Sequence, residues 1–242
     1  MSKRSEMRHT GRHTRFVVGY CHPDTVDGDF ARSLATLCLY SKRVANLIAA
    51  RSGPRVATAR NDIVRAFLKS GEEWLFMVDA DMVFGADLLD RFAEVVDKDK
   101  FPIVGGLAFI QGSEERPIRP NMMVWDKDED GDPILYPVVG FPDNGMCKIA
   151  ATGAACLAIH RSALLKMQEK YGHLVHPWFQ ETTNEKHEWG EDVTFCVRAG
   201  QVEIPVHVYT GIVVGHNKKH TLTLADFEPY RQPLLKAVQD AS

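Results

Sequence analysis

The sequence predicts an α/β fold in which helices flank a sheet of buried parallel strands. The main observation is an apolar run, Trp74–Val78, that lies between Lys69-Ser70-Gly71 and Asp79-Ala80-Asp81. A short apolar run between turn residues is typical of a strand that is buried on both faces, and such strands belong to parallel sheets. Two further observations support this class: a second buried run at Arg15–Tyr20, and apolar residues at helical spacing over Val56–Lys69.

The first half of the chain alternates between these two patterns. After the strand at Arg15–Tyr20, the segment Cys21–Asp24 is expected to be a loop at its carboxyl end, which is a usual docking place for a nucleotide base or ribose. Apolar residues at helical spacing predict two helices around a further strand at Val44–Ala49. The helices expected before the acidic segment are Asp29–Tyr40 and Val56–Lys69, and the helix expected after it is Ala86–Val96.

The second half contains a predicted hairpin and four more strands. Strands at Met122–Trp125 and Ile134–Val139 flank an acidic tip, Asp126–Pro133. The tip imitates the start of a calcium-binding loop, but Pro137 stands where such a loop needs a glutamate, so we expect a solvated turn. The other strands are expected at Phe101–Phe109, Lys148–His160, Ile204–Tyr209 and Ile212–Val214, and the other helices at Arg161–Tyr171, Val193–Ala199 (ended by Gly200) and Leu224–Val238.

The composition excludes several classes of protein. The chain has 242 residues, of which 45% are hydrophobic and 25% charged, as is ordinary for a globular protein. Its net charge of −3 gives no basic field for nucleic acid or an anionic membrane. The five cysteines form no Cys-x-x-Cys pair, so neither a zinc site nor a disulfide framework is expected. No apolar run approaches membrane-spanning length, and we expect a cytoplasmic protein, in the host cytoplasm if it is viral.

The strongest functional signal is the acidic pair at the end of the central strand. Side chains alternate along an extended chain, so Asp79 and Asp81 are expected on the same side, where α/β sheets place their ligands. A divalent cation is the partner that two such carboxylates most readily share. The alternative is a turn or a helix cap without a metal, because Asp87 or Gly85 could open the next helix.

Other segments are candidates for parts of the same site. Arg60 lies near a helix start, where its guanidinium and the free backbone N–H groups both favour a diphosphate; the alternative is a surface ion pair. The small residues Ala151–Ala155 would let a substrate lie against the backbone, and Gly105-Gly106 suggests another close approach. The polar, aromatic segment His176–His187 is a candidate lid.

Taken together, four segments resemble the nucleotide-sugar-dependent glycosyltransferases of the GT-A fold. They are VDADMVF with its Asp-x-Asp signature, ATGAACLAIHR, WGEDVTFCVRA and GHNKKH, in this order over most of the chain. The chain looks most like small single-domain members found in bacteriophages. The resemblance implies a Rossmann-like mixed sheet flanked by helices, with a small β-hairpin on the acceptor side. It also implies one domain over 15–242, with a nucleotide-sugar half at 15–110 and an acceptor half at 111–242. The polar, basic residues of 1–14 predict a flexible tail, and the alternative is a weak anion-binding arm.

The resemblance also implies roles for particular residues. Asp81 would bind the metal, Asp79 would contact the ribose or reach the metal through water, and His216 would complete the metal shell. Asp192 would be the catalytic base of an inverting reaction, with Glu191 beside it on the acceptor side; the motif alone does not fix the stereochemistry, so a retaining reaction stays open. There is one glycine after Trp189 where some relatives have two, so the carboxylate that faces the acceptor stays open. The remaining implied contacts are Tyr20, His22, Arg60 and Lys218 for the donor, and Trp189, Gly153 and Trp178 for the sugar and acceptor.

The predicted activity is therefore transfer of a sugar from a UDP- or GDP-linked donor to an acceptor hydroxyl. Oxygen ligands suit magnesium or manganese, and an imidazole from His216 favours manganese. The acceptor stays open among a protein, a modified DNA base, a glycan and a small molecule. A sugar-phosphate nucleotidyltransferase is an alternative, although Cys21–Asp27 lacks its glycine-rich basic loop; a non-catalytic nucleotide-sugar or metal-binding module is another.

Overall fold

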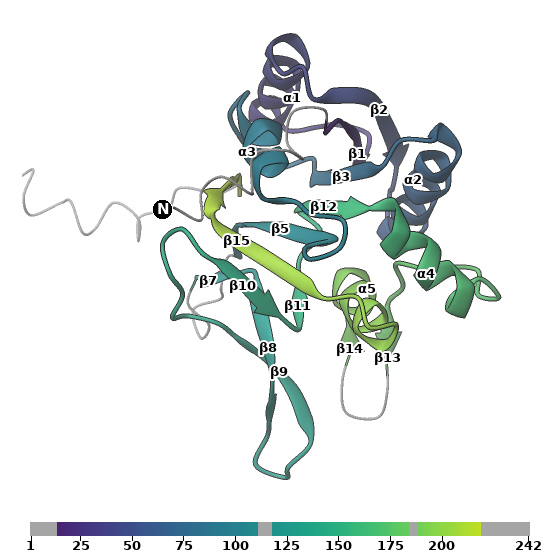
Figure 1. Cartoon of the computed structure of the whole chain (residues 1–242), viewed down its shortest axis with the longest axis vertical. Coiled ribbons are helices and arrows are strands. Elements are labelled where there is room, and N and C mark those ends of the chain that lie inside the picture. Colours follow the sequence, from purple (N-terminus) through teal and green to yellow (C-terminus); the bar gives the residue numbers. More distant parts are fainter. Residues whose placement is uncertain (1–13, 111–117, 184–187, 219–242) are drawn as a thin grey trace, which may run out of the picture.

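A computed structural model describes residues 14–110, 118–183 and 188–218. Its centre is a seven-stranded mixed sheet with the strand order β10-β15-β5-β12-β3-β1-β2 (Figure 1). Strands β1, β2 and β3 are parallel, β12 is antiparallel to β3 and β5, β15 is parallel to β5, and β10 is antiparallel to β15. The predicted α/β class with a mixed sheet is confirmed. The strands are β1 (Phe16–His22), β2 (Val44–Arg51), β3 (Trp74–Asp79), β5 (Ile103–Leu107), β10 (Met146–Ile149), β12 (Cys156–His160) and β15 (Val206–Val213).

Helices cover both faces of this sheet, which explains why the central strand is apolar throughout. Alternate residues of β3 enter two different cores: Leu75 and Met77 pack on the side of α2, α4 and α5, whereas Phe76 and Val78 pack on the side of α1 and α3 (Figure 1). This is the period of two that an extended chain imposes. The helices are α1 (Gly28–Tyr40), α2 (Val56–Ser70), α3 (Leu88–Val95), α4 (Arg161–Tyr171) and α5 (Glu191–Gln201).

The predicted hairpin is also present. Strands β8 (Met122–Lys127) and β9 (Pro133–Pro137) are antiparallel, and β11 (Ala151–Thr152) pairs with β8. The acidic tip is a turn in which the Asp128 carboxylate accepts hydrogen bonds from two backbone N–H groups of the tip. Three further two-stranded ladders join β4 (Met82–Val83) to β16 (Gly215–His216), β6 (Phe109–Ile110) to β7 (Arg119–Pro120), and β13 (Thr182–Thr183) to β14 (Glu188–Trp189).

The prediction of one long strand over Lys148–His160 is wrong. The segment Lys148–His160 is divided among β10, β11 and β12, because the chain turns at Gly153–Ala155. It leaves the edge of the large sheet, pairs briefly with the hairpin, and returns as β12 between β5 and β3. The small residues of this segment therefore include a turn between two sheets, and they do not form the centre of one strand.

Several boundaries differ for local reasons. Helix α5 continues through Gly200 to Gln201, and the chain reverses in the turn that follows, at Glu203, whose φ is 58°. The two predicted late strands are one continuous strand, β15, and β1 continues to His22 where a loop was expected. The close approach at Gly106 is made by the sheet itself, since an added Cβ would lie 2.9 Å from Cys156 Sγ.

Some predictions concern residues outside the described part of the chain. These are most of the basic tail, the last two residues of the GHNKKH segment (Lys219 and His220) and the closing helix Leu224–Val238. Among the residues that the structure describes, no helix is long and apolar enough to cross a membrane.

Candidate active site

A cavity of about 780 Å³ lies at the carboxyl ends of β1 and β3, where the starts of α1, α2 and α5 meet. Helix α2 has no side-chain cap, so its first backbone N–H groups remain available beside the cavity. We call this cavity the strand-end cavity. Its polar and charged lining residues include Asp27, Ser52, Arg60, Asp79, Asp81, Glu191, Asn217 and Lys218.

Arg60 connects two walls of this cavity. Its Nη2 donates to Asp79 Oδ1 at 2.8 Å and its Nε donates to Glu191 Oε1 at 3.0 Å, while only 4% of the residue is exposed. Burial opposes the charge of Arg60, but the nearby carboxylate of Asp79, followed by Cys21 and Glu191, more than compensates, so the pKa of Arg60 lies above its usual value. The alternative interpretation of Arg60 as part of a surface ion pair is therefore excluded, because its guanidinium is buried between two carboxylates.

The second acidic residue of the pair has different partners. Strand β16 pairs with β4, which places His216 opposite Met82 and beside Asp81. Asp81 Oδ2 lies 3.0 Å from His216 Nε2 and 2.9 Å from Lys218 Nζ. His216 Nδ1 lies 2.8 Å from the carbonyl oxygen of Phe109, which can only accept a hydrogen bond, so Nδ1 carries a proton. With Nδ1 protonated, an unprotonated Nε2 would turn its lone pair toward the carboxylate, and a proton or a cation between the two groups would remove this repulsion.

The separation of Asp81 Oδ2 and His216 Nε2 is that of an ordinary hydrogen bond and is also compatible with two ligands of a divalent metal ion. Two adjacent ligands of an octahedral ion at about 2.1 Å are separated by about 3.0 Å, which matches the distance from Asp81 Oδ2 to His216 Nε2. The charged side chains that line the cavity are four carboxylates and two basic groups, which leaves two negative charges and also favours a cation. Asp79 is held by Arg60, so it is not part of this pair. No group of three or more His, Cys, Asp and Glu side chains is placed to hold a metal within the described ranges.

Asp192 differs from its neighbour Glu191. Burial, and then the charge of Glu191, raise the pKa of Asp192 to about 6, although Arg60 opposes this shift. Its Oδ1 accepts a hydrogen bond from the N–H of Val193 at 2.7 Å. A Cβ added to Gly153 would lie 3.4 Å from Asp192 Oδ2, so Gly153 leaves room beside this carboxylate. Glu191 is paired with Arg60, and Asp192 is therefore the carboxylate that is better placed to take a proton.

The predicted sugar-stacking residues have different surroundings. Trp189 is partly exposed, and its ring lies 5.7 Å from that of Trp125, a residue that the sequence analysis did not single out. The prediction for Trp178 is wrong: the residue is 2% exposed, and its Nε1 donates to the carbonyl of Leu164 at 2.9 Å. A tryptophan that packs in the core cannot present a face to a sugar.

The described part of the predicted lid is also packed. Asn61 Nδ2 donates to the carbonyl of Phe179 at 2.7 Å, and Arg198 binds both His176 O and Gln180 Oε1 at 2.6 Å. These buried contacts hold residues 176–180 against α2 and α5, which does not fit a free lid; residues 184–187 lie outside the described chain.

Two residues predicted to bind the donor, Tyr20 and His22, lie beside the strand-end cavity but do not line it. Tyr20 packs on Phe30 with ring centres 5.4 Å apart, and His22 Nδ1 lies 2.6 Å from Pro23 O. Cys21, between them in sequence, points to the other face of the sheet and lines the cavity. Alternation along β1 accounts for this difference, because the predicted loop at this point is strand.

A contact between the start of α1 and the end of the described chain was not predicted from the sequence. Asp27 caps α1 by accepting from Asp29 N at 2.9 Å, and it also accepts from Asn217 Nδ2 at 3.0 Å. Asn217 N donates to Asp81 O at 2.8 Å. Asp27 could have been found as an N-cap residue directly before a helical pattern, whereas Asn217 carries no signal of its own.

Comparison with solved structures agrees with this fold. A crystal structure of A197 from STIV aligns with a TM-score of 0.55 at 14% identity, over 85% of this chain and 87% of that chain. A crystal structure of GalNAc-T7 with UDP, GalNAc and Mn2+ aligns with the same TM-score at 13% identity, over 85% of this chain and 44% of that chain. The structure of CMP:2-keto-3-deoxy-manno-octonic acid synthetase complexed with CTP aligns at 12% identity over 93% of this chain and 100% of that chain. Its TM-score of 0.44 is too low to support an argument. No protein-family model matches the sequence, and no curated protein matches it significantly. The chain thus has a GT-A-like fold.

Proposed function

We propose that the protein is a metal-dependent glycosyltransferase that moves a sugar from a nucleoside-diphosphate sugar to an acceptor hydroxyl. The observation that carries the proposal is that the strand-end cavity is lined by two acidic residues with different neighbours: Asp81, which contacts His216, and Glu191, which directly precedes Asp192. The Asp81–His216 pair has the spacing of two metal ligands, and Asp192 is a partly buried carboxylate with a raised pKa. Arg60 links the two parts, because it binds Asp79 on one side and Glu191 on the other.

The charges of the cavity support a metal-bound diphosphate as ligand. A diphosphate is anionic and the charged lining residues carry a net negative charge, so a cation is needed to bring the two together. A divalent ion held by Asp81 and His216 would stabilise the negative charge that develops on the departing diphosphate. Lys218 Nζ, which lies on Asp81 Oδ2, can turn toward the phosphates, and the uncapped start of α2 offers them backbone N–H groups. GalNAc-T7, which shares the fold, was crystallised with UDP, GalNAc and Mn2+, and we extend this donor class and manganese to the present chain.

Asp192 is proposed as the base that accepts the proton of the acceptor hydroxyl. As the acceptor oxygen forms its bond to the anomeric carbon, the bond from that carbon to the diphosphate oxygen breaks, and the hydroxyl proton passes to an oxygen of Asp192. A carboxylate with a pKa of about 6 is still ionised at neutral pH and is more basic than an ordinary aspartate. Attack opposite the leaving group would invert the anomeric centre.

Glu191 and Arg60 are proposed as positioning residues. Because Glu191 is bound to Arg60 at 3.0 Å, it contributes negative charge beside Asp192 without being free to take a proton. Asp79, bound to the same guanidinium, is held at the end of β3 facing the donor side. Gly153 keeps the space beside Asp192 open for the acceptor, and Trp189 supplies an aromatic surface close to it.

The experiment that tests the proposal is calorimetric titration of UDP and GDP with and without Mn²⁺, followed by hydrolysis of UDP- and GDP-sugars in water. We expect nucleotide binding only with the metal, and slow release of sugar from one donor class. Binding without any hydrolysis or transfer would favour the non-catalytic module. Release of pyrophosphate from a nucleoside triphosphate and a sugar phosphate would favour the nucleotidyltransferase.

A further inference from the structure

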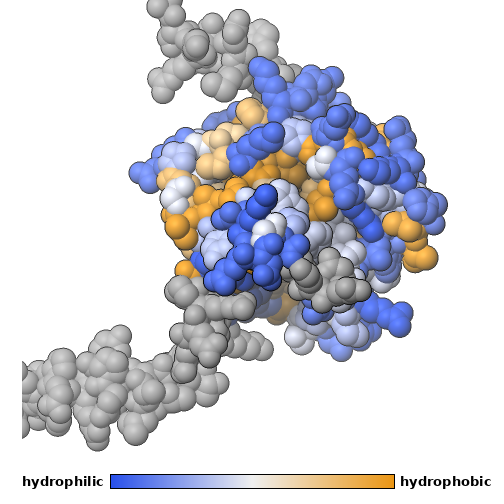
Figure 2. Space-filling model, turned by 90° about the horizontal axis from the view of Figure 1, so that it is seen from below, coloured by the Kyte–Doolittle hydropathy of each residue, from blue (hydrophilic) through white to orange (hydrophobic). Residues whose placement is uncertain are grey.

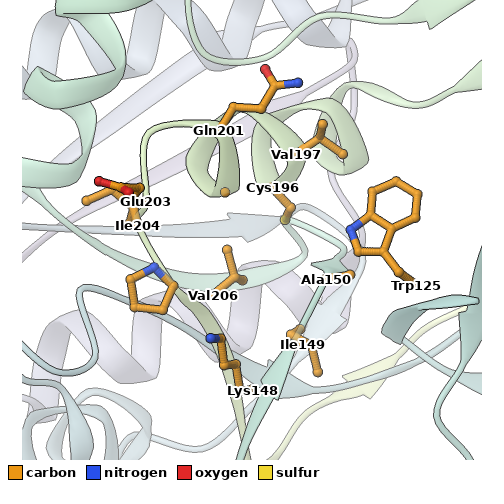
Figure 3. Close-up of a pocket in the computed structure, with 12 residues that line it drawn as sticks. Trp125, Lys148, Ile149, Ala150, Cys196, Val197, Gln201, Glu203, Ile204 and Val206 are labelled. Carbon is orange, nitrogen blue, oxygen red and sulfur yellow. The ribbon is translucent and has the colours of Figure 1, made fainter. Parts of the chain in front are cut away.

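A second cavity, of about 700 Å³, lies along α5 on the side away from Arg60 (Figure 3). Its floor is apolar and includes Ile149 and Val206 from the paired strands β10 and β15, while Val197 and Gln201 of α5 form one wall. Trp125 of the hairpin and Glu203 stand on opposite sides of the opening in the view of Figure 3. We call this cavity the α5 groove. Seen from below, hydrophobic surface gathers in the middle of the molecule and is framed by hydrophilic residues (Figure 2).

The α5 groove combines an aromatic wall with polar groups at its rim. Trp125 is 45% exposed and lines the groove, so part of its ring is accessible to a ligand there. Glu203 is exposed and can accept hydrogen bonds from hydroxyl groups, whereas Gln201 is exposed but its Oε1 already accepts from the hydroxyl of Tyr171. Sugar rings have apolar C–H faces that pack on aromatic rings and a rim of hydroxyl groups that needs hydrogen-bond partners, so this combination suits a carbohydrate.

Glu203 has a backbone conformation that its side chain does not favour. Its φ of 58° is left-handed, and it is the only such non-glycine residue among those the structure describes. It follows the end of α5, where Glu203 N donates to Gly200 O at 3.0 Å and Ile204 N donates to Ala199 O at 2.9 Å. Glycine is the usual residue at such a helix end, because it adopts this conformation without strain. A glutamate in this place is disfavoured for the fold alone, which indicates a use for its side chain in the groove.

The α5 groove and Asp192 lie on the same helix. On an α-helix Val197 lies about 7.5 Å, and Gln201 about 13.5 Å, from Asp192 along the axis. The groove also reaches Trp125, whose ring contacts that of Trp189, three residues before Asp192. A molecule that occupies the groove and also presents a hydroxyl to Asp192 must therefore be longer than one sugar ring.

We infer that the α5 groove is a binding subsite for the distal residues of an oligosaccharide acceptor, whose terminal hydroxyl is glycosylated beside Asp192. This inference rests on the proposed function and narrows the acceptor to a glycan chain.

The test compares the parent protein with Trp125→Ala, Glu203→Gly and a control, Tyr136→Ala. Tyr136 is 54% exposed on the same hairpin, but it pairs with Val124 and so points to the opposite face from Trp125. Each protein is applied to an array that carries microbial, plant and animal oligosaccharides together with peptides. The glycan that is retained, and its shorter fragments, are then titrated by calorimetry, and thermal melting reports the fold of every variant.

We expect the parent to retain a glycan and to bind its tetrasaccharide at least tenfold more tightly than its disaccharide. Trp125→Ala should weaken this binding more than tenfold, and Tyr136→Ala should leave it unchanged. Glu203→Gly should weaken binding while raising the melting temperature, a combination that a merely structural role would not produce. Equal affinity of all four proteins, retention of peptides alone, or no retention of any glycan would overturn the inference. Metal-dependent binding of UDP or GDP, measured in parallel, reports separately whether the proposed function itself fails.

Discussion

Arg60 and Glu191 are 131 positions apart in the chain, yet Arg60 Nε donates to Glu191 Oε1 at 3.0 Å inside the protein. The same guanidinium holds Asp79 at the end of β3. One buried side chain of α2 therefore fixes the carboxylate on the donor side and the carboxylate next to the proposed base. The two halves of the candidate site are connected by this contact, and not only by the sheet beneath them.

Replacement of Arg60 by methionine should destabilise the fold strongly. The change leaves Asp79 and Glu191 without their shared cation, and loss of one partner from a buried ion pair costs about 3–5 kcal/mol. Urea denaturation measures this loss. The matched control is Arg65→Met on the same helix, whose pair with Asp62 is largely exposed and should contribute less than about 1 kcal/mol. Equal losses for the two variants would contradict the buried role of Arg60.

Transfer activity should depend on the ionisation of Asp192. Burial and the charge of Glu191 raise its pKa to about 6, while Arg60 opposes the shift and Asp79 adds to it. The base must be ionised, so kcat/KM should be level above pH 7 and fall about tenfold for each pH unit below pH 6. Glu191→Gln removes a neighbouring negative charge and should move this limb to lower pH. If kcat/KM does not fall below pH 6 in the parent, and if Glu191→Gln does not shift the pH dependence, Asp192 is excluded as the base.

Asp192→Asn should separate stability from catalysis. The pKa of Asp192 in the folded protein is above its ordinary value, so the fold favours the protonated carboxyl group over the carboxylate. The protonated carboxyl group therefore stabilises the fold at low pH, and this stabilisation is lost as the pH rises through 6. The uncharged asparagine should therefore raise the unfolding free energy at pH 7 to 8 by roughly 1–2 kcal/mol. The difference from the parent should shrink below pH 4. Transfer should fall by about 10²–10⁴-fold with donor binding retained; a destabilised variant at pH 8 would contradict the assigned environment.

Trp178 should matter for folding and Trp189 for function. Trp178 is buried in the core, so Trp178→Ala should cost about 3–5 kcal/mol in urea denaturation. Trp189 is partly exposed, so Trp189→Ala should cost much less stability and should raise the KM for the acceptor. The reverse pattern would show that the buried ring is the one that meets the substrate.

The sequence predicted the sheet well where strands are buried on both faces. Trp74–Asp79 could be located because every position of β3 is apolar up to its acidic end. The segment Lys148–His160 could not, because small residues such as those around Gly153 permit both strand and turn, and the pairing with β8 is a tertiary contact. Gly200 was misread for a similar reason, since packing of α5 overrides a weak local stop signal.

The candidate site was predictable in residue type but not in pairing. Asp79 and Asp81 were found together, but the structure gives them separate partners, Arg60 and His216. A sequence cannot show that Arg60 would be buried, because surface arginines near helix starts have the same pattern. Trp178 and Trp189 were equally plausible as aromatic contacts, and only the packed core distinguishes them.

The most direct test of the account is calorimetric titration of UDP and GDP into the parent and Asp81→Asn, with and without Mn²⁺. Asp81→Asn keeps the shape of the side chain but removes the charge that lies between His216 and Lys218. We expect the parent to bind one of the two nucleotides only with the metal, and the variant to lose at least tenfold in affinity. Nucleotide binding that is equally tight in both proteins, or equally tight without Mn²⁺, would contradict the proposed metal-dependent site.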